Sequence, residues 1–138
     1  MAFKVLVVDD QATIRRIAMR LLSERGAECL EAGTGARALD ILKAESVGLV
    51  VTDWNMPGMS GLDFIRSLRS RDHLKTTPVV MMTGRDHEDD IVTAMRAGVS
   101  GYIVKPFGRS AFLAQIAAAL KFSLPDPETA GESGRARV

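Results

Sequence analysis

The chain has 138 residues, the size of one ordinary domain, and its 46% hydrophobic and 25% charged residues are those of an average globular protein. Its 18 Lys and Arg residues and 17 Asp and Glu residues leave a net charge of +1, so no bulk basic field favours nucleic acid or an anionic membrane. No apolar run approaches the roughly 20 residues that span a bilayer, which excludes an integral membrane protein.

The N-terminus and the cysteine content predict the compartment. The opening segment, MAFKVLVVDD, passes from a few apolar residues directly into acids, without the basic start and long apolar stretch of a secretory signal. The only cysteine, Cys29, excludes an internal disulfide bond and suits a reducing environment. We therefore expect a cytoplasmic protein.

Five short apolar runs predict β-strands, at residues 4–8, 28–32, 49–52, 78–83 and 101–104. The first, third and fourth are apolar on both faces, as in parallel strands covered by helices on each side. A helical pattern follows each run, around residues 14–22, 36–42, 62–68, 91–95 and 112–120. This alternation predicts a single α/β domain with a doubly wound parallel sheet and right-handed crossovers.

Helix ends and the C-terminal segment are also indicated. Gly26 and Gly98 are expected to end the first and fourth helices. Arg15, Arg16 and Arg20 are assigned to the polar face of the first helix. Residues 1–122 form the predicted domain, and residues 123–138, SLPDPETAGESGRARV, are interpreted as a flexible polar tail too short to be an output domain.

Polar residues directly follow four of the predicted strands. They are Asp9 and Asp10, Asp53, Thr83, and Lys105 with Pro106. Ligands of open α/β sheets bind at the carboxyl ends of the strands, so we expect these side chains to converge. Three carboxylates repel one another unless a cation joins them, and oxygen ligands favour Mg²⁺. A hydroxyl, an ammonium and Mg²⁺ would balance a phosphoryl group, and a carboxylate can accept one as an aspartyl phosphate.

A purely structural interpretation stands beside this one. Asp10 and Thr83 are both suitable helix caps, and a lone Lys105 is usually solvated. Independent caps give no reason for the lysine, which favours a common site. Asn55 is a further candidate, offering its backbone carbonyl to the metal. The Lys105–Pro106 bond is a candidate for the cis isomer, because it lies where a strand turns sharply.

The motifs VLVVDD, DWNMPGMSG, VVMMTG and SGYIVKPF occur in this order at the predicted strand ends. In these motifs the chain resembles the receiver domains of two-component response regulators, and among them the stand-alone chemotaxis regulators, over residues 3 to about 122. The resemblance implies a flavodoxin-like (βα)5 fold with strand order 2-1-3-4-5. It also implies a signalling switch and not an enzyme: such a domain catalyses only its own phosphoryl transfer and dephosphorylation.

The resemblance implies a role for each site residue. Asp53 corresponds to the phosphoacceptor. Asp10, Asp53 and the Asn55 backbone carbonyl correspond to direct Mg²⁺ ligands, and Asp9 to the acid that holds a metal-bound water. Thr83 and Lys105 correspond to the groups that stabilise the phosphoryl oxygens.

The resemblance further assigns a conformational switch to Thr83 and Tyr102. Thr83 moves onto the phosphoryl group, and Tyr102 turns inward to fill the vacated space; the alternative for Tyr102 is an exposed strand aromatic without this role. Arg85 departs from the chemotaxis pattern, which has an acid there. We expect Arg85, with Asn55, to tune the rate of dephosphorylation, by pairing with the phosphoryl group or with an acid of a partner.

The implied phosphodonor is a sensor histidine kinase. The implied downstream partner binds the face made by the fourth helix, fifth strand and fifth helix of a monomer. A flagellar motor protein is the first candidate and a histidine phosphotransfer protein in a phosphorelay is the second; a DNA-binding output is disfavoured. A haloacid-dehalogenase-like phosphatase is the alternative outside this class. Such an enzyme needs an acid two residues after the nucleophile, where this chain has Asn55.

Overall fold

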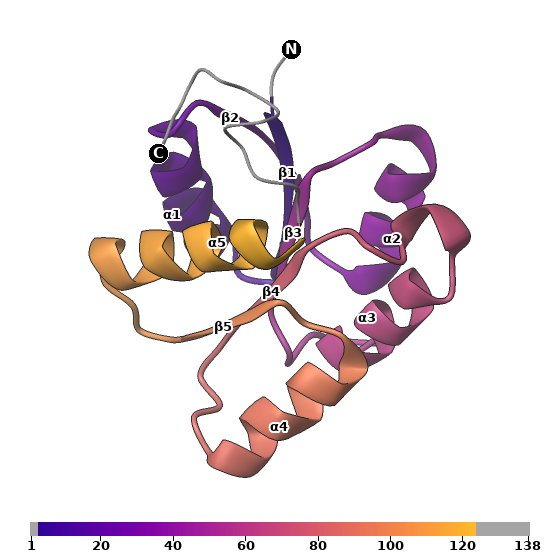
Figure 1. Ribbon diagram of the computed structural model, residues 1–138. Coiled ribbons are helices and arrows are strands. Elements are labelled where there is room, and N and C mark those ends of the chain that lie inside the picture. The colour runs from indigo at the N-terminus through magenta and orange to yellow at the C-terminus, as the bar shows by residue number, and fades with distance from the viewer. Residues whose placement is uncertain (1–2, 124–138) are drawn as a thin grey trace.

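The computed structural model describes residues 3–123, which form five parallel strands and five α-helices in alternation (Figure 1). The sheet order β2-β1-β3-β4-β5 confirms the predicted doubly wound fold. The elements are β1 (Phe3–Val8), α1 (Ala12–Ser23), β2 (Ala27–Ala32), α2 (Gly35–Ala44), β3 (Leu49–Thr52), α3 (Gly61–Arg69), the 3-10 turn η1 (Asp72–Leu74), β4 (Val79–Thr83), α4 (Glu88–Ala97), β5 (Gly101–Val104) and α5 (Arg109–Ser123).

Burial along the strands explains the apolar runs of the sequence. Every residue of β3 and β4 is buried, and so are the last four residues of β1. These strands lie in the middle of the sheet, where both faces are covered and alternation with polar residues is impossible. The edge strand β2 is only partly buried and accordingly carries Glu28 and Glu31.

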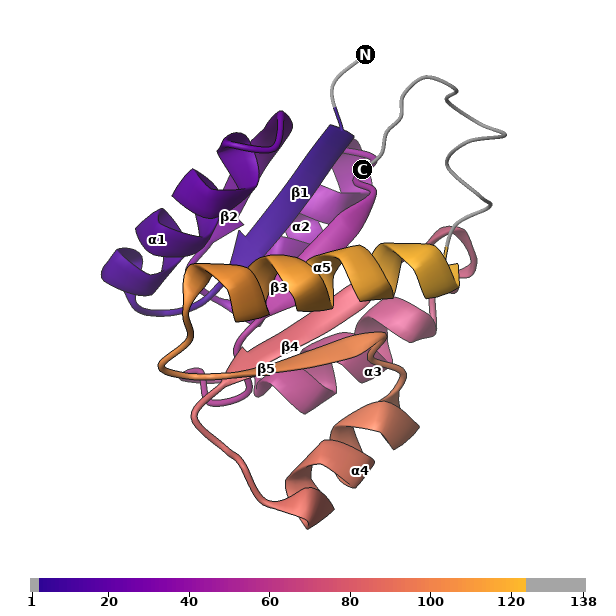
Figure 2. The same ribbon diagram turned by 60° about the vertical axis from the view of Figure 1, so that its left-hand side comes forward.

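Two helical layers cover the sheet. Figures 1 and 2 show α1 and α5 on one face and α2, α3 and α4 on the other. Phe112 of α5 and Leu22 of α1 belong to the core on the first face. Phe64 of α3 and Leu39 of α2 belong to the core on the second face. Burying a side chain of this size contributes roughly 1.5–3 kcal/mol to the stability of the fold. The packed helical layers therefore hold the strand ends, which carry the polar residues, in place.

The residues that cap the helices differ from the candidate site residues. Gly98 follows α4 in the left-handed conformation at φ 110°, which confirms the predicted stop. Gly26, at φ 88°, lies in the turn after α1, whose C-cap is Glu24. The N-cap residues of α1 and α4 are Gln11 and His87. The interpretation of Asp10 and Thr83 as helix caps is therefore wrong.

Two differences from the sequence-based expectation concern chain segments. The turn η1 between α3 and β4 was not predicted, because three residues are too few for a periodic signal. Helix α5 reaches Ser123, the residue assigned to the start of the tail. The rest of that segment, residues 124–138, lies outside the described residues. Within residues 3–123, no helix is long and apolar enough to cross a membrane.

Candidate functional site

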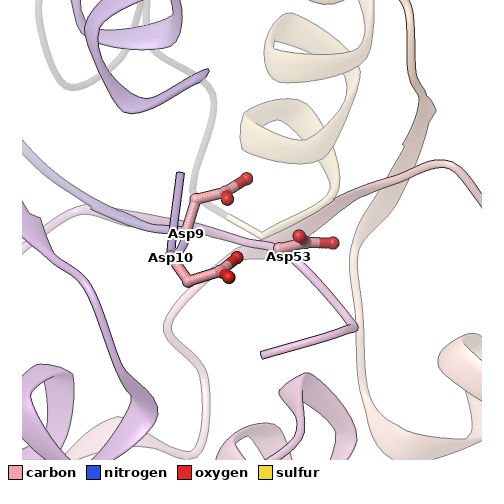
Figure 3. A group of neighbouring side chains, drawn as sticks. All are labelled: Asp9, Asp10 and Asp53. Carbon is pink, nitrogen blue, oxygen red and sulfur yellow. The ribbon is translucent and has the colours of Figure 1, made fainter. Parts of the chain in front are cut away.

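Three carboxylates meet at the carboxyl edge of the sheet. Val8 at the end of β1 is in register with Thr52 at the end of β3, so the next residues of both strands emerge side by side. Oxygen atoms of Asp9, Asp10 and Asp53 all lie within 4.8 Å of one another (Figure 3). The convergence predicted from the strand ends is therefore present for these three acids.

Backbone contacts hold Asp53 at the centre of the site. Its N–H donates to the Val8 carbonyl at 2.9 Å, which continues the β1–β3 pairing. Its Oδ1 accepts a 2.6 Å hydrogen bond from the Trp54 N–H. Gly61 approaches from α3: its N–H donates to the Trp54 carbonyl at 2.7 Å, and a Cβ there would overlap the Asp53 carbonyl oxygen. The acceptor loop, defined here as residues 53–61, is thus pinned at both ends.

Asp9 is fully buried and is fixed from three sides. Its Oδ1 accepts from the Gln11 N–H at 2.9 Å, and its Oδ2 accepts from Lys105 Nζ at 2.8 Å. The Arg15 guanidinium donates to its carbonyl at 2.7 Å. Burial nevertheless raises the pKa of Asp9 above its usual value, against the hydrogen bonds from Lys105 and Gln11 that lower it. The buried negative charge is therefore only partly compensated by the protein.

Lys105 supplies the single ammonium of this cluster. It follows β5, its backbone N–H donates to the Thr83 carbonyl at 2.8 Å, and its bond to Pro106 is cis. Its Nζ lies 3.1 Å from Asp53 Oδ2, in addition to its contact with Asp9. Burial works to lower the pKa of Lys105, but the bonds to Asp9 and the charges of both acids outweigh it and raise the pKa. Lys105 is therefore a cation over the whole physiological pH range.

The donor set fits a hard divalent cation. Three carboxylates against one ammonium leave an excess of negative charge in a largely buried site. Asp10 is exposed, so one side of the cluster is open to solvent and to an entering ion. Carboxylate oxygens at this spacing are the ligands that Mg²⁺ takes, with water completing its coordination.

Thr83 and Tyr102 are linked through the backbone of residue 85. Thr83 is fully buried at the end of β4, and its hydroxyl accepts from the Arg85 N–H at 3.4 Å. The Tyr102 hydroxyl donates to the Arg85 carbonyl at 2.8 Å. Tyr102 is buried, and burial raises the pKa of its phenol to about 12. Tyr102 is therefore not an exposed strand aromatic, and its role as a switch stays a prediction.

The side chain of Arg85 is engaged within the chain. Its Nε and Nη2 lie 3.3 and 3.1 Å from Asn55 Oδ1, and its Nη1 lies 3.5 Å from Asp90. Its Cζ lies 4.4 Å from the centre of the Trp54 ring. The Asn55 side chain thus accepts two hydrogen bonds from Arg85.

Two residues near the site were not recognised from the sequence. Arg15 was assigned to the polar face of its helix, yet it joins the Asp9 carbonyl to Glu31 of β2, 2.7 Å away. Helical spacing does not distinguish a solvated arginine from one that reaches over a strand end. Gly61 is predicted from the sequence only as part of the segment that opens the third helix, residues 58–61. The first position of a helix tolerates most side chains, so a glycine there has no local reason. Its presence was the available signal for a close backbone approach.

Comparison with known proteins places this geometry among characterised folds. Residues 5–117 match the family described as "Response regulator receiver domain". The chemotaxis protein CheY of Pseudomonas aeruginosa is 47% identical over 105 residues, which are 75% of this chain and 85% of that protein. Chemotaxis protein CheY-3 of Vibrio cholerae is 48% identical over 105 residues, 75% of this chain and 81% of its own length.

Solved structures agree with the sequence relatives. A high-resolution structure of chemotaxis response regulator CheY4 of Vibrio cholerae matches with a TM-score of 0.82 at 29% identity, over 86% of this chain and 99% of that chain. A receiver domain protein from Clostridium thermocellum matches with a TM-score of 0.77 at 30% identity, over 87% and 95% of the respective chains. The described fold is thus shared almost from end to end.

Proposed function

The chain belongs to the family of response regulator receiver domains, and on that basis we propose that it is a phosphorylation-activated signalling switch with Asp53 as the phosphoacceptor. The observation that carries this proposal is the position of Asp53, held by backbone bonds between the Lys105 ammonium and the acid pair Asp9 and Asp10. A nucleophilic carboxylate is useful only where the charge of its phosphorylated form can be neutralised, and this site concentrates the groups that do so.

The phosphodonor in this proposal is a phosphohistidine of a sensor kinase. An Asp53 oxygen attacks phosphorus, the phosphorus–nitrogen bond breaks, and the departing imidazole keeps the electron pair and takes a proton from water. Lys105 and the hydroxyl of Thr83 stabilise the phosphoryl oxygens that result. The chain catalyses only this transfer and the later hydrolysis, so it is not an enzyme acting on an external substrate.

The cation in this proposal is Mg²⁺, held by Asp10, Asp53 and the backbone carbonyl of Asn55, with Asp9 holding a metal-bound water. An ion held by these residues would supply positive charge to balance the phosphoryl oxygens. The excess of carboxylates over ammonium groups at this edge of the sheet supports this assignment.

The output of the switch is a binding event on the face formed by α4, β5 and α5. Thr83 is drawn to the phosphoryl group, and Tyr102 and the surrounding loop respond, which shifts the population of two states. Val92 and Met95 of α4 and Val104 of β5 are exposed on these elements and offer apolar area to a partner. The relatives named for chemotaxis favour the flagellar motor switch as that partner.

Two other functions are retained as alternatives. In a phosphorelay, the same aspartyl phosphate would pass its group to a histidine phosphotransfer protein. A haloacid-dehalogenase-like phosphatase is disfavoured, because its general acid would occupy position 55. The amide there accepts hydrogen bonds from Arg85 and has no proton of suitable acidity to donate to a leaving group.

The lifetime of the aspartyl phosphate is part of the proposal. Asn55 of the acceptor loop and Arg85 lie in contact, and in this proposal they control how water approaches the phosphoryl group. Changing Asn55→Ala and Arg85→Ala separately should alter the decay rate of phosphorylated protein, followed by intact mass after removal of the donor. Unchanged decay in both variants would contradict the assignment.

The central experiment uses a small phosphodonor. Acetyl phosphate with Mg²⁺ should add one phosphoryl group to the intact protein and change the fluorescence of Trp54, the only tryptophan, which directly follows Asp53. Asp53→Ala should abolish both responses, whereas the matched control Asp40→Ala, an exposed acid on α2, should retain them. Phosphorylation that persists in Asp53→Ala would overturn the proposal. Adding a histidine phosphotransfer protein to the product then separates relay from motor output.

A further inference from the structure

Arg85 makes contact with three parts of the site at once. Its side chain reaches Asn55 and Trp54 in the acceptor loop. Its N–H donates to the Thr83 hydroxyl, and its carbonyl accepts from the Tyr102 hydroxyl. One residue therefore connects the acceptor loop to both residues of the proposed switch.

The side-chain contacts link residue 85 to two residues of the acceptor loop. The guanidinium lies over Trp54, the best aromatic partner for a cation, and its planar fork places two donors on one amide oxygen. Trp54 is a rigid support, because its side chain is buried and its backbone N–H donates a hydrogen bond to Asp53 Oδ1. A further contact, from Nη1 to Asp90 at 3.5 Å, is longer and joins the same side chain to α4.

The loop around Arg85 provides few other restraints. Gly84 is exposed, and a Cβ built there meets no atom within 4 Å. Asp86 and His87 on the other side are exposed as well. Between the buried end of β4 and the start of α4, the Arg85 side chain is thus the main described attachment of this loop to the site.

We propose that Arg85 is a positioning residue that holds Tyr102 in its buried orientation by fastening the β4–α4 loop to the acceptor loop. A buried phenol needs a hydrogen-bond acceptor, and the Arg85 carbonyl is that acceptor. If residue 85 moves away, the Tyr102 hydroxyl loses its hydrogen-bond acceptor. Turning toward water then becomes favourable for the ring, because water can accept that hydrogen bond. Movement of Trp54 or Asn55 is then transmitted to Tyr102 through Arg85. The inference rests on the proposed role of Tyr102 as the switch residue.

The test exploits the single tyrosine and single tryptophan of the chain. Protein labelled with 3-fluorotyrosine gives one fluorine resonance, from Tyr102, recorded without any phosphodonor. In Arg85→Ala we expect this resonance to shift toward its position in the denatured protein, and its broadening by a soluble paramagnetic agent to increase several-fold. Arg96→Ala, which removes an exposed arginine from α4, should leave both unchanged.

Two further variants keep the test decisive. Trp54→Phe weakens the contact with the guanidinium and should give an intermediate shift. Arg85→Lys keeps the charge but loses the fork on Asn55, so it should restore the wild-type resonance only in part. An Arg85→Ala resonance identical to that of wild type, in folded protein, overturns the inference. Because no phosphoryl group is present, that result would leave the assignment of Asp53 untouched, whereas failure of Asp53 to be phosphorylated would leave this measurement valid.

Discussion

The Tyr102 hydroxyl donates a 2.8 Å hydrogen bond to the backbone carbonyl of Arg85, seventeen positions earlier in the chain. The phenol that makes this bond is buried, so ionising it would remove the donor and leave a charge away from water. The contact therefore fixes the orientation of the ring, and burial of the ring raises the pKa of its phenol.

Stability should depend on alkaline pH through Tyr102. Burial raises the pKa of its phenol from 10 to about 12. Between these values the folded chain keeps a proton that the unfolded chain has lost, so the free energy of unfolding falls as the pH rises through this window. Urea unfolding measured at a series of pH values should show the decline. Tyr102→Phe should abolish this component, and an equal decline in that variant would contradict the assignment.

Removing the ammonium of Lys105 should destabilise the metal-free protein. Lys105→Met leaves Asp9 and Asp53 without their common cation, and breaking a buried ion pair costs about 3–5 kcal/mol, less where one partner is partly solvated. We expect a loss of about 2 kcal/mol in the free energy of unfolding. Lys43→Met, in an exposed pair with Asp40, is the control and should change little. Equal effects of the two substitutions would show that the acid cluster does not need Lys105.

Mg²⁺ should stabilise the folded chain through the acid cluster. A ligand at 100 times its dissociation constant adds about 2.7 kcal/mol to the free energy of unfolding, which thermal melts detect. Asp10→Asn removes one exposed carboxylate from the cluster, so it should lower the apparent affinity for Mg²⁺ without destabilising the metal-free form. Asp63→Asn on α3 is the matched control and should keep the full response. A response to Mg²⁺ that is identical in both variants would place the ion elsewhere.

A methyl group at Gly61 should disrupt the acceptor loop. Its Cβ would overlap the Asp53 carbonyl and crowd the Trp54 backbone, neither of which can move without shifting the acceptor. We expect Gly61→Ala to cost about 1–3 kcal/mol of stability and to slow phosphorylation. Gly84→Ala meets open space and should be neutral or stabilising by about 0.4–1 kcal/mol. Both are measured by urea unfolding and by labelling with acetyl phosphate; normal labelling of Gly61→Ala would refute the role given to this glycine.

The fold was predictable because its strands carry a simple signal. Residues 49–52 and 101–104 were assigned to strands with the observed limits, since each is a short apolar run between polar turns. Parallel strands expose their carboxyl ends at one edge, so the meeting of Asp9 and Asp53 followed from order alone. The predicted limits of the other strands and helices differ from the observed limits by one or a few residues. Contacts with neighbouring side chains determine where each of these elements ends.

The sequence pattern did not predict the side-chain contacts between loops. The position of Arg85 over Trp54 depends on how two loops from different strands fold back over the sheet, and no periodicity encodes it. Arg15 was assigned to solvent for the same reason, although it bonds to the Asp9 carbonyl. In both cases the partners of a long, flexible cationic side chain lie far away in the sequence, and a local sequence pattern does not identify them.

Asp9 and Lys105 are 96 positions apart in the sequence, so they are synthesised at different times. Strands β1 and β3 and Asp53 leave the ribosome before β5, so a nascent chain carries Asp9 and Asp53 without the ammonium that joins them. A product terminated ahead of position 105 would therefore contain Asp53 without the cation that it shares with Asp9.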